Sequence, residues 1–236
     1  MSEGRVKTEI ATIPEDAVDV EDDIYGILDP TAETFSSGCT TLDLALGGGW
    51  GVNRVSNIVG DKSTGKTLLA IEAAANFVQK YPEGRVVYAE AEAALDVGYA
   101  ETLGFPTDKV DFVEVFTVEE VFKDITERIK SSDNTPTLYV IDSMDALSDA
   151  KELGRDMEAG TYGTKPRAVS ELFRRLNQMV SKSNITLMIV SQIRDNIGVT
   201  FGKKHKRAGG HAMDFYATHC VWLSHLKRID PTRLGV

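Results

Sequence analysis

The stretch Gly60-Asp61-Lys62-Ser63-Thr64-Gly65-Lys66-Thr67 fits the pattern of Gly, four residues, then Gly-Lys-Thr at every position. Residues 54–59 before it predict a short buried strand, and the Ala- and Leu-rich residues 66–80 predict a helix. Such a loop surrounds phosphates with backbone N–H groups, and the following helix points its positive end at them. The stretch therefore predicts a nucleoside triphosphate site, with Lys66 on the β- and γ-phosphates and the Thr67 hydroxyl on Mg²⁺.

Strands and helices are predicted to alternate through the rest of the chain. The expected strands cover 54–59, 85–91, 111–115, 137–142, 185–191 and 219–226, and the expected helices cover 66–80, 97–104, 118–131 and 167–183. Alternation of this kind requires parallel strands joined by crossover helices. The sequence therefore predicts an α/β fold with a mostly parallel central sheet, helices on both faces and ligands at the carboxyl ends of the strands.

Two long stretches, 144–166 and 193–211, have no strong periodicity and are rich in Gly and charged residues. Loops of that length are uncommon inside a compact domain and usually carry function. We therefore expect both stretches to be functional or mobile loops.

The net charge of −10 is unevenly distributed along the 236 residues. Residues 1–35 contain ten acidic side chains against two basic ones, so 36–236 is nearly balanced. We expect 1–35 to be an acidic arm, which could serve oligomerisation, and 36–236 to be the core. The basic run Lys203-Lys204-His205-Lys206-Arg207 lies in that core and is either a solvated loop or a nucleic-acid contact.

The sequence also argues against a membrane-spanning, a secreted or a disulfide-rich protein. No run approaches the roughly 18 apolar residues of a membrane span, and the first residues lack the apolar stretch of a secretory signal. The two cysteines, Cys39 and Cys220, form neither a metal pattern nor a disulfide framework. A cytosolic location and no membrane partner are the expectation.

Acidic residues follow two of the predicted strands. Asp142 ends the apolar stretch 137–142, where a carboxylate that holds Mg²⁺ or its water is expected. Glu90 and Glu92 end the strand that begins near residue 85, and alternation of side chains places them on one face. Glu92 is the favoured base for activating water because it lies nearer the phosphates, and Glu90 is an orienting neighbour or second choice.

Several further segments resemble the bacterial RecA recombinase family in order and spacing over residues 36–229, and a phage-borne relative of that family would fit the same pattern. They are Ser37 to Gly47, Ala91 to Asp96 with Tyr99-Ala100, Ser191 to Arg194, and Gly209-Gly210-His211-Ala212-Met213-Asp214-Phe215-Tyr216-Ala217. The resemblance implies an ATPase that uses ATP and Mg²⁺, hydrolyses ATP to ADP and phosphate, and forms filaments on single-stranded DNA. In that family the filament pairs its strand with homologous double-stranded DNA.

The resemblance also assigns roles to residues near the nucleotide. Glu92 falls at the family's catalytic glutamate, and Asp96 and Tyr99 fall at its adenine contacts. Gln192 falls where the family senses the γ-phosphate and couples it to the DNA loop. The alternative to these roles is a purely structural one. Tyr99 would then pack on the sheet, and Gln192 would cap the end of a strand.

The two aperiodic stretches coincide with the DNA-binding loops of the family. The expected DNA contacts are Arg167, Ser170, Arg174, Arg194, Ile197, Val199, Phe201, Lys203, Lys204, Lys206, Arg207, Gly209 and Gly210. The first three are spaced for one helix face, and the basic run suits a groove that tracks the DNA backbone. Ile197, Val199 and Phe201 are apolar groups that could insert between bases.

The chain also departs from the family pattern. Asp214 stands where a lysine is usual, and Ala93 where a histidine is usual. The family's lysines that act on a neighbouring subunit's γ-phosphate lie beyond the matched region, with Lys227, Arg228 and Arg233 as weak substitutes. Two alternative functions therefore stay open, an ATP-binding filament protein with little hydrolysis and a ring-forming motor or helicase on the same fold.

Overall fold

The computed structural model describes residues 33–92, 95–131, 134–149, 164–195, 205–207 and 215–226. Within these ranges, the backbone alone is described at 164–168, 194–195 and 205–207. In the part of the chain so described, no helix is long and apolar enough to span a bilayer.

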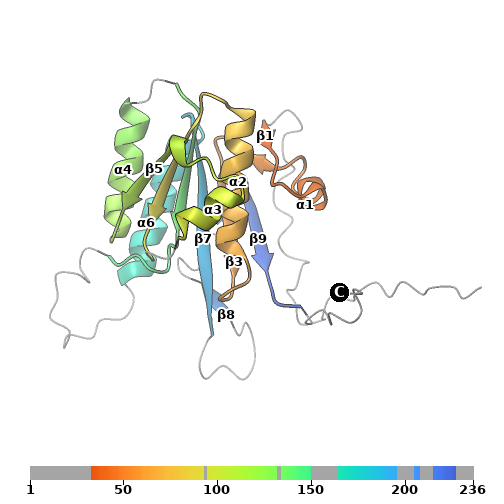
Figure 1. Cartoon of the computed structure of the whole chain (residues 1–236). Helices are drawn as coiled ribbons and strands as arrows, with labels where there is room; N and C mark the ends of the chain where they lie inside the picture. The colour runs from red at the N-terminus through yellow and green to blue at the C-terminus, as the bar shows by residue number, and fades with distance from the viewer. Residues whose placement is uncertain are drawn as a thin grey trace, which may run out of the picture.

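A twisted parallel sheet forms the centre of the molecule (Figure 1). Its six parallel strands lie in the order β5-β4-β6-β7-β3-β9, and β8 pairs antiparallel with the end of β7. The strands are β3 (Val55–Gly60), β4 (Arg85–Glu90), β5 (Val110–Glu114), β6 (Thr137–Asp142), β7 (Ile185–Asp195), β8 (His205–Arg207) and β9 (His219–Leu223). The carboxyl ends of β4, β6, β7 and β3 therefore lie side by side at one edge.

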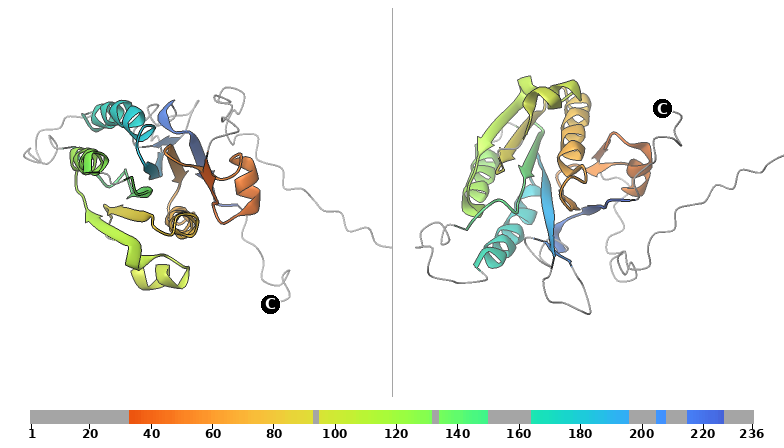
Figure 2. Two further views of the ribbon diagram at one scale, coloured as in Figure 1. Left: turned by 90° about the horizontal axis from the view of Figure 1, so that it is seen from above. Right: turned by 60° about the horizontal axis from the view of Figure 1, so that its bottom comes forward.

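Helices cover both faces of this sheet (Figure 2). On one face are α2 (Lys66–Lys80) and α3 (Val97–Thr102), and on the other are α4 (Val118–Ser131) and α6 (Thr164–Val180). A small hairpin-like layer, β1 (Thr34–Phe35), α1 (Thr40–Ala45) and β2 (Trp50–Gly51), packs beside α2, and the 3₁₀ turn η2 (Thr107–Lys109) precedes β5.

The predicted α/β architecture with a mostly parallel sheet is confirmed. The expected elements are all present, with ends shifted by a few residues, and the largest shifts are in α6, which starts at Thr164, and β7, which continues to Asp195. The expectation of a loop over the whole of 193–211 is wrong at 193–195 and 205–207. There the backbone forms the β7–β8 ladder, in which Arg194 stands opposite Lys206 and Ile193 opposite Arg207.

The core consists of two apolar layers, one on each face of the sheet. Central strands are buried on both faces, and all six residues of β3 are buried, including the polar Ser56 and Asn57. In α2 the small residues Ala70, Ala73 and Ala74 let the helix pack closely on the sheet, while Phe77 fills the space beside Phe35 with their ring centroids 5.2 Å apart. This packing fixes the start of α2, and with it the loop of residues 60–67.

Truncation of Phe77 is expected to destabilise the fold strongly because its ring is fully buried between α2 and β1. We predict that Phe77→Ala lowers the free energy of unfolding by about 3–5 kcal/mol, measured by urea titration. Gln79→Ala, at an exposed position of the same helix, is the matched control and should change the free energy by less than about 0.5 kcal/mol. Equal effects of the two variants would contradict the assigned packing.

Candidate nucleotide-binding and catalytic site

The loop of residues 60–67 connects β3 to α2 at the carboxyl edge of the sheet. A Cβ on Gly60 would lie 2.5 Å from Thr64 Oγ1 and 2.8 Å from the Leu223 carbonyl oxygen, so glycine is required there by close packing. Gly65, the residue before α2, has a φ of 91°, a left-handed conformation that glycine adopts without strain. The loop is also held internally, since Thr64 Oγ1 donates to the Asp61 carbonyl oxygen at 2.9 Å.

Lys66 is buried at the start of α2, and its side chain returns across the loop. Its Nζ donates to the Asp61 carbonyl oxygen at 2.6 Å. The ammonium group is thus positioned inside the loop, together with the N-terminus of a fifteen-residue helix. Both features place positive charge where the sequence pattern predicts phosphate groups.

Asp142 at the end of β6 is bound to the phosphate loop by a hydrogen bond. Thr67 Oγ1 donates to Asp142 Oδ2 at 2.8 Å, and the Tyr88 hydroxyl donates to the same oxygen at 2.8 Å. Tyr88 is fully buried on β4, so its hydroxyl holds the carboxylate from behind. The two residues assigned to Mg²⁺, Thr67 and Asp142, are therefore adjacent in the structure.

Burial raises the pKa of the Asp142 carboxyl above its ordinary value, although hydrogen bonds from Tyr88 and Thr67 lower it. Nearby Glu92 raises the pKa further, and the Lys66 ammonium opposes this rise. Burial also places the pKa of the Tyr88 hydroxyl well above its usual range, with Asp142 contributing in the same direction. Tyr88 therefore stays protonated and serves as a hydrogen-bond donor to the carboxylate.

A divalent cation fits the oxygen ligands present here. Hydroxyl and carboxylate oxygens are the ligands that Mg²⁺ prefers, and Mg²⁺ at phosphate sites is held by one or two protein groups together with the phosphates. Across the described ranges, no cluster of three or more His, Cys, Asp or Glu side chains could cage a metal by itself. Thr67 and Asp142 thus match a metal site that the nucleotide completes.

Glu92 lies beside the same edge, just after β4. Its Oε1 accepts a hydrogen bond from Ser143 Oγ at 2.5 Å and another from Gln192 Nε2 at 2.6 Å. Gln192 projects from β7, directly beside Gly60 in the β3–β7 register. The structure therefore brings together Glu92, Gln192 and the phosphate loop, which come from three different strands.

Glu90 and Glu92 have different surroundings, although both were expected on one strand face. The strand β4 ends at Glu90, so Glu92 lies in the bend beyond it. Glu90 Oε1 accepts a hydrogen bond from the Leu95 backbone N–H at 2.6 Å. This bond ties the end of β4 to the residue just before Asp96, the cap of α3. Glu92 is the carboxylate that contacts Gln192, which supports its choice over Glu90.

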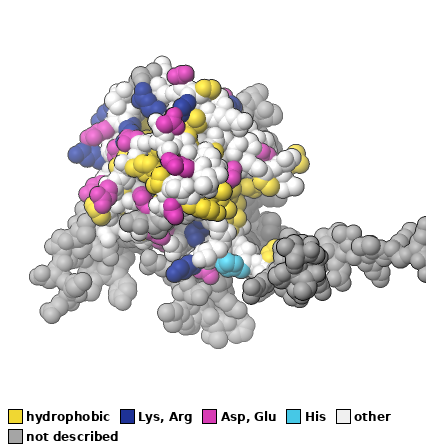
Figure 3. Space-filling view, viewed as in Figure 1, with side chains coloured by type: hydrophobic (Ala, Val, Ile, Leu, Met, Phe, Trp, Pro, Cys, Tyr) yellow, Lys and Arg dark blue, Asp and Glu magenta, His cyan; other side chains and the backbone are white. Residues whose placement is uncertain are grey.

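The two expected adenine contacts lie at the start of α3. Asp96 caps this helix, since its Oδ1 accepts from the Tyr99 backbone N–H at 3.0 Å. The Tyr99 side chain is 58% exposed, so it does not pack on the sheet. Figure 3 shows hydrophobic side chains gathered on the face that carries α3, to which Val97 and Tyr99 contribute.

The expected DNA contacts are only partly within the described residues. Ser170 and Arg174 lie on α6, half-buried and exposed respectively, and the backbone of Arg167 lies in the first turn of this helix. Arg194 lies on β7, and Lys206 and Arg207 lie on β8, where the backbone alone is described. Ile197, Val199, Phe201, Lys203, Lys204, Gly209 and Gly210 lie outside the described residues.

The sequence patterns did not single out four residues that contact this site. They are Tyr88, Ser143, Asp145 and His225. Ser143 directly follows the predicted Asp142, so proximity in sequence could have suggested it. His225 Nε2 contacts the Lys62 carbonyl oxygen at 3.1 Å from beyond β9, a long-range contact with no sequence signal.

Comparison with known proteins identifies related sequences. The model of the RecA N-terminal domain matches residues 27–232. Protein RecA of Nostoc punctiforme is 38% identical over 186 residues, which cover 79% of this chain and 51% of the relative. Protein RecA of Mycoplasma mycoides is 38% identical over 187 residues, which cover 79% of this chain and 53% of the relative. Protein RecA of Prochlorococcus marinus strain AS9601 is 37% identical over 186 residues, which cover 79% of this chain and 50% of the relative.

The chain spans about half the length of these curated relatives. The family match nevertheless includes every element from the phosphate loop to β9, and so all the strands that carry the site. On this match and on the identity to its relatives, the chain belongs to the RecA family.

Proposed function

We propose that this chain is a DNA-dependent ATPase that forms filaments on single-stranded DNA and promotes homologous pairing and strand exchange. The observation that carries the proposal is the contact between Gln192 and Glu92 beside the phosphate loop. It joins the residue assigned to water activation to β7, the strand that leads directly into the expected DNA loop. Membership of the RecA family supports the same function.

The chemistry proposed for the site uses three groups from this chain. Lys66 and the N-terminus of α2 hold the β- and γ-phosphates, because both present positive charge inside the loop. Glu92 takes a proton from the attacking water as general base. Gln192 contacts Glu92 in the present structure, and the same amide could instead donate to an oxygen of the γ-phosphate when nucleotide is bound.

Thr67 and Asp142 would hold Mg²⁺, through the hydroxyl and the carboxylate that meet at 2.8 Å. When bound, the cation would neutralise part of the negative charge of the phosphates. Tyr88 is a positioning residue for this pair, since its buried hydroxyl fixes Asp142 Oδ2.

Contact with DNA is proposed at the same carboxyl edge of the sheet. The proposed DNA-contact elements are α6, with Arg167 in its first turn and Ser170 and Arg174 further along, and the β7–β8 ladder, with Arg194, Lys206 and Arg207. Single-stranded and double-stranded DNA are the proposed partners, together with further copies of the chain in a helical filament. The acidic arm 1–35 is the proposed oligomerisation segment, and Lys227, Arg228 and Arg233 are the proposed cations for a neighbour's nucleotide.

Two substitutions separate nucleotide binding from turnover. Lys66→Ala should abolish ATP hydrolysis stimulated by single-stranded DNA, because the phosphates lose their cation. Glu92→Gln should retain binding of a fluorescent ATP analogue while turnover falls by about 10²–10⁴-fold, because the general base is lost. Glu127→Gln, an exposed glutamate on α4, is the control and should match the unmodified protein. Unchanged DNA-stimulated hydrolysis in Lys66→Ala would refute the proposed function.

Removing the Tyr88 hydroxyl should weaken the affinity of the nucleotide site for Mg²⁺, because Asp142 Oδ2 loses a hydrogen bond that orients it. We expect Tyr88→Phe to raise the Mg²⁺ concentration for half-maximal binding of a fluorescent ATP analogue by about tenfold, because groups that orient metal ligands have effects of about 10–100-fold. Tyr139→Phe deletes a buried hydroxyl that instead contacts Asp124 at 2.9 Å on the α4 face, and is the matched control. The same Mg²⁺ requirement in both variants would remove Tyr88 from the site.

Neutralising the basic run should weaken DNA binding in a salt-dependent way. Replacing Lys203, Lys204, Lys206 and Arg207 by Ala should lower affinity for single-stranded DNA and flatten the slope of log affinity against log salt, because each lost phosphate contact contributes about 0.7 to the slope. Lys130→Ala with Lys182→Ala, exposed positions near the opposite edge of the sheet, is the control. An unaltered slope would show that the run does not contact phosphates.

A further inference from the structure

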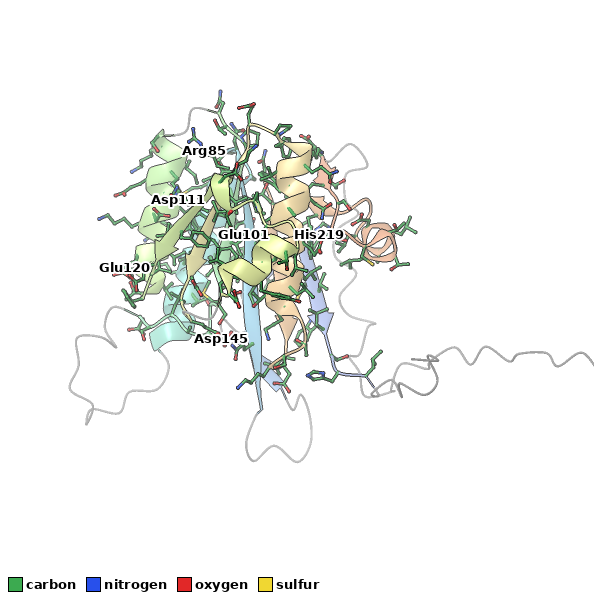
Figure 4. All side chains as sticks on the ribbon, in the orientation of Figure 1. Arg85, Glu101, Asp111, Glu120, Asp145 and His219 are labelled. Carbon is green, nitrogen blue, oxygen red and sulfur yellow. The ribbon has the colours of Figure 1, made fainter. Side chains whose placement is uncertain are left out.

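A buried carboxylate stands behind Gln192. Asp145 lies in the turn after β6, its side chain is 6% exposed, and its Oδ2 accepts a hydrogen bond from the Gln192 backbone N–H at 2.6 Å. Figure 4 labels Asp145 at the carboxyl edge of the sheet, the edge that carries the phosphate loop. Neither the phosphate-loop pattern nor the other roles assigned above involve this residue.

The position of Asp145 explains how β7 is held beyond the end of β6. The β6–β7 register ends at the pair Ile141 and Ile189, after which Met144 donates its backbone N–H to the Val190 carbonyl oxygen at 3.0 Å. Two residues further along β7, the Gln192 backbone N–H donates to the Asp145 side chain. The carboxylate takes the position that the carbonyl oxygen of a neighbouring strand would have in a continued ladder. The carboxylate therefore extends the attachment of β7 to the turn as far as Gln192.

Gln192 connects Asp145 to the catalytic carboxylate through two hydrogen bonds. Its backbone N–H is held by Asp145 at 2.6 Å, and its side-chain Nε2 donates to Glu92 Oε1 at 2.6 Å. A carboxylate that accepts from N–H forms a stronger bond than a neutral acceptor, and leaving a buried carboxylate or N–H without its partner is costly. The backbone of Gln192 is thus restrained at the residue from which its amide reaches Glu92.

We propose that Asp145 is a positioning residue for ATP hydrolysis, which holds the Gln192 backbone so that the Gln192 amide meets Glu92. The inference rests on the proposed roles of Glu92 and Gln192. It predicts that Asp145 affects the chemical step and not nucleotide affinity, because the contacts of Lys66, Thr67 and Asp142 do not involve it. A purely structural residue would instead affect stability and all functions together.

The test compares Asp145→Ala with Asp145→Asn in steady-state ATP hydrolysis with saturating single-stranded DNA. In Asp145→Ala we expect kcat to fall about tenfold or more while KM for ATP stays within about twofold, because misplacement of an orienting group acts on the reacting geometry. Asp145→Asn keeps an oxygen that can accept from Gln192 and should retain at least about a third of kcat. Equal losses in the two variants, or an unchanged kcat in Asp145→Ala, would overturn the proposal.

A double-mutant cycle shows whether Asp145 acts through Gln192. In a Gln192→Ala background, Asp145→Ala should reduce kcat no further, whereas independent roles would give multiplied losses and overturn the proposal. If Asp145→Ala unfolds below the assay temperature, Asp145→Leu replaces it, since leucine fills similar space without an acceptor. Absence of hydrolysis in the unmodified protein would refute the proposed function, while normal hydrolysis with an insensitive Asp145→Ala would refute only this inference.

Discussion

The hydrogen bond between Thr67 and Asp142 is the constraint on which the rest of the site depends. It joins the phosphate loop, which belongs to β3 and α2, to β6, although β7 lies between these strands in the sheet. The bond therefore fixes the phosphate loop relative to the carboxyl ends of three strands at once. Without it, the hydroxyl and carboxylate that suit Mg²⁺ would have no fixed separation, and the neighbouring Glu92 and Gln192 would have no fixed relation to the phosphates.

Keeping several carboxylates together at a sheet edge is costly, and the structure offsets the cost with donors. Tyr88 and Thr67 both donate to Asp142, Ser143 and Gln192 both donate to Glu92, and Gln192 donates through its backbone to Asp145. Most of these donors have no other role assigned by the phosphate-loop pattern. The residues proposed for catalysis are thus supported by a further layer of hydrogen-bonding groups, held by a sheet buried on both faces.

The sequence was sufficient to predict the fold and the residues whose chemistry is local. The phosphate loop, the parallel sheet and the position of Asp142 follow from periodicity and from short patterns in which neighbouring residues act together. Tyr88, Asp145 and His225 were not predicted, because their roles arise from contacts between segments 54, 47 and 163 residues apart in sequence. The β7–β8 ladder was missed for a related reason. Five of its six paired residues are charged or histidine, so they give no apolar alternation that would indicate a strand, and the partners are 10 to 14 residues apart in sequence.

The central claim is that nucleotide bound at this edge drives assembly of the chain along single-stranded DNA. Electron microscopy of the protein with single-stranded DNA and a slowly hydrolysed ATP analogue tests this claim most directly. Extended helical filaments that form with the analogue, and not without nucleotide, are the expected result. Closed rings, or the absence of any nucleotide-dependent assembly on DNA, would contradict it.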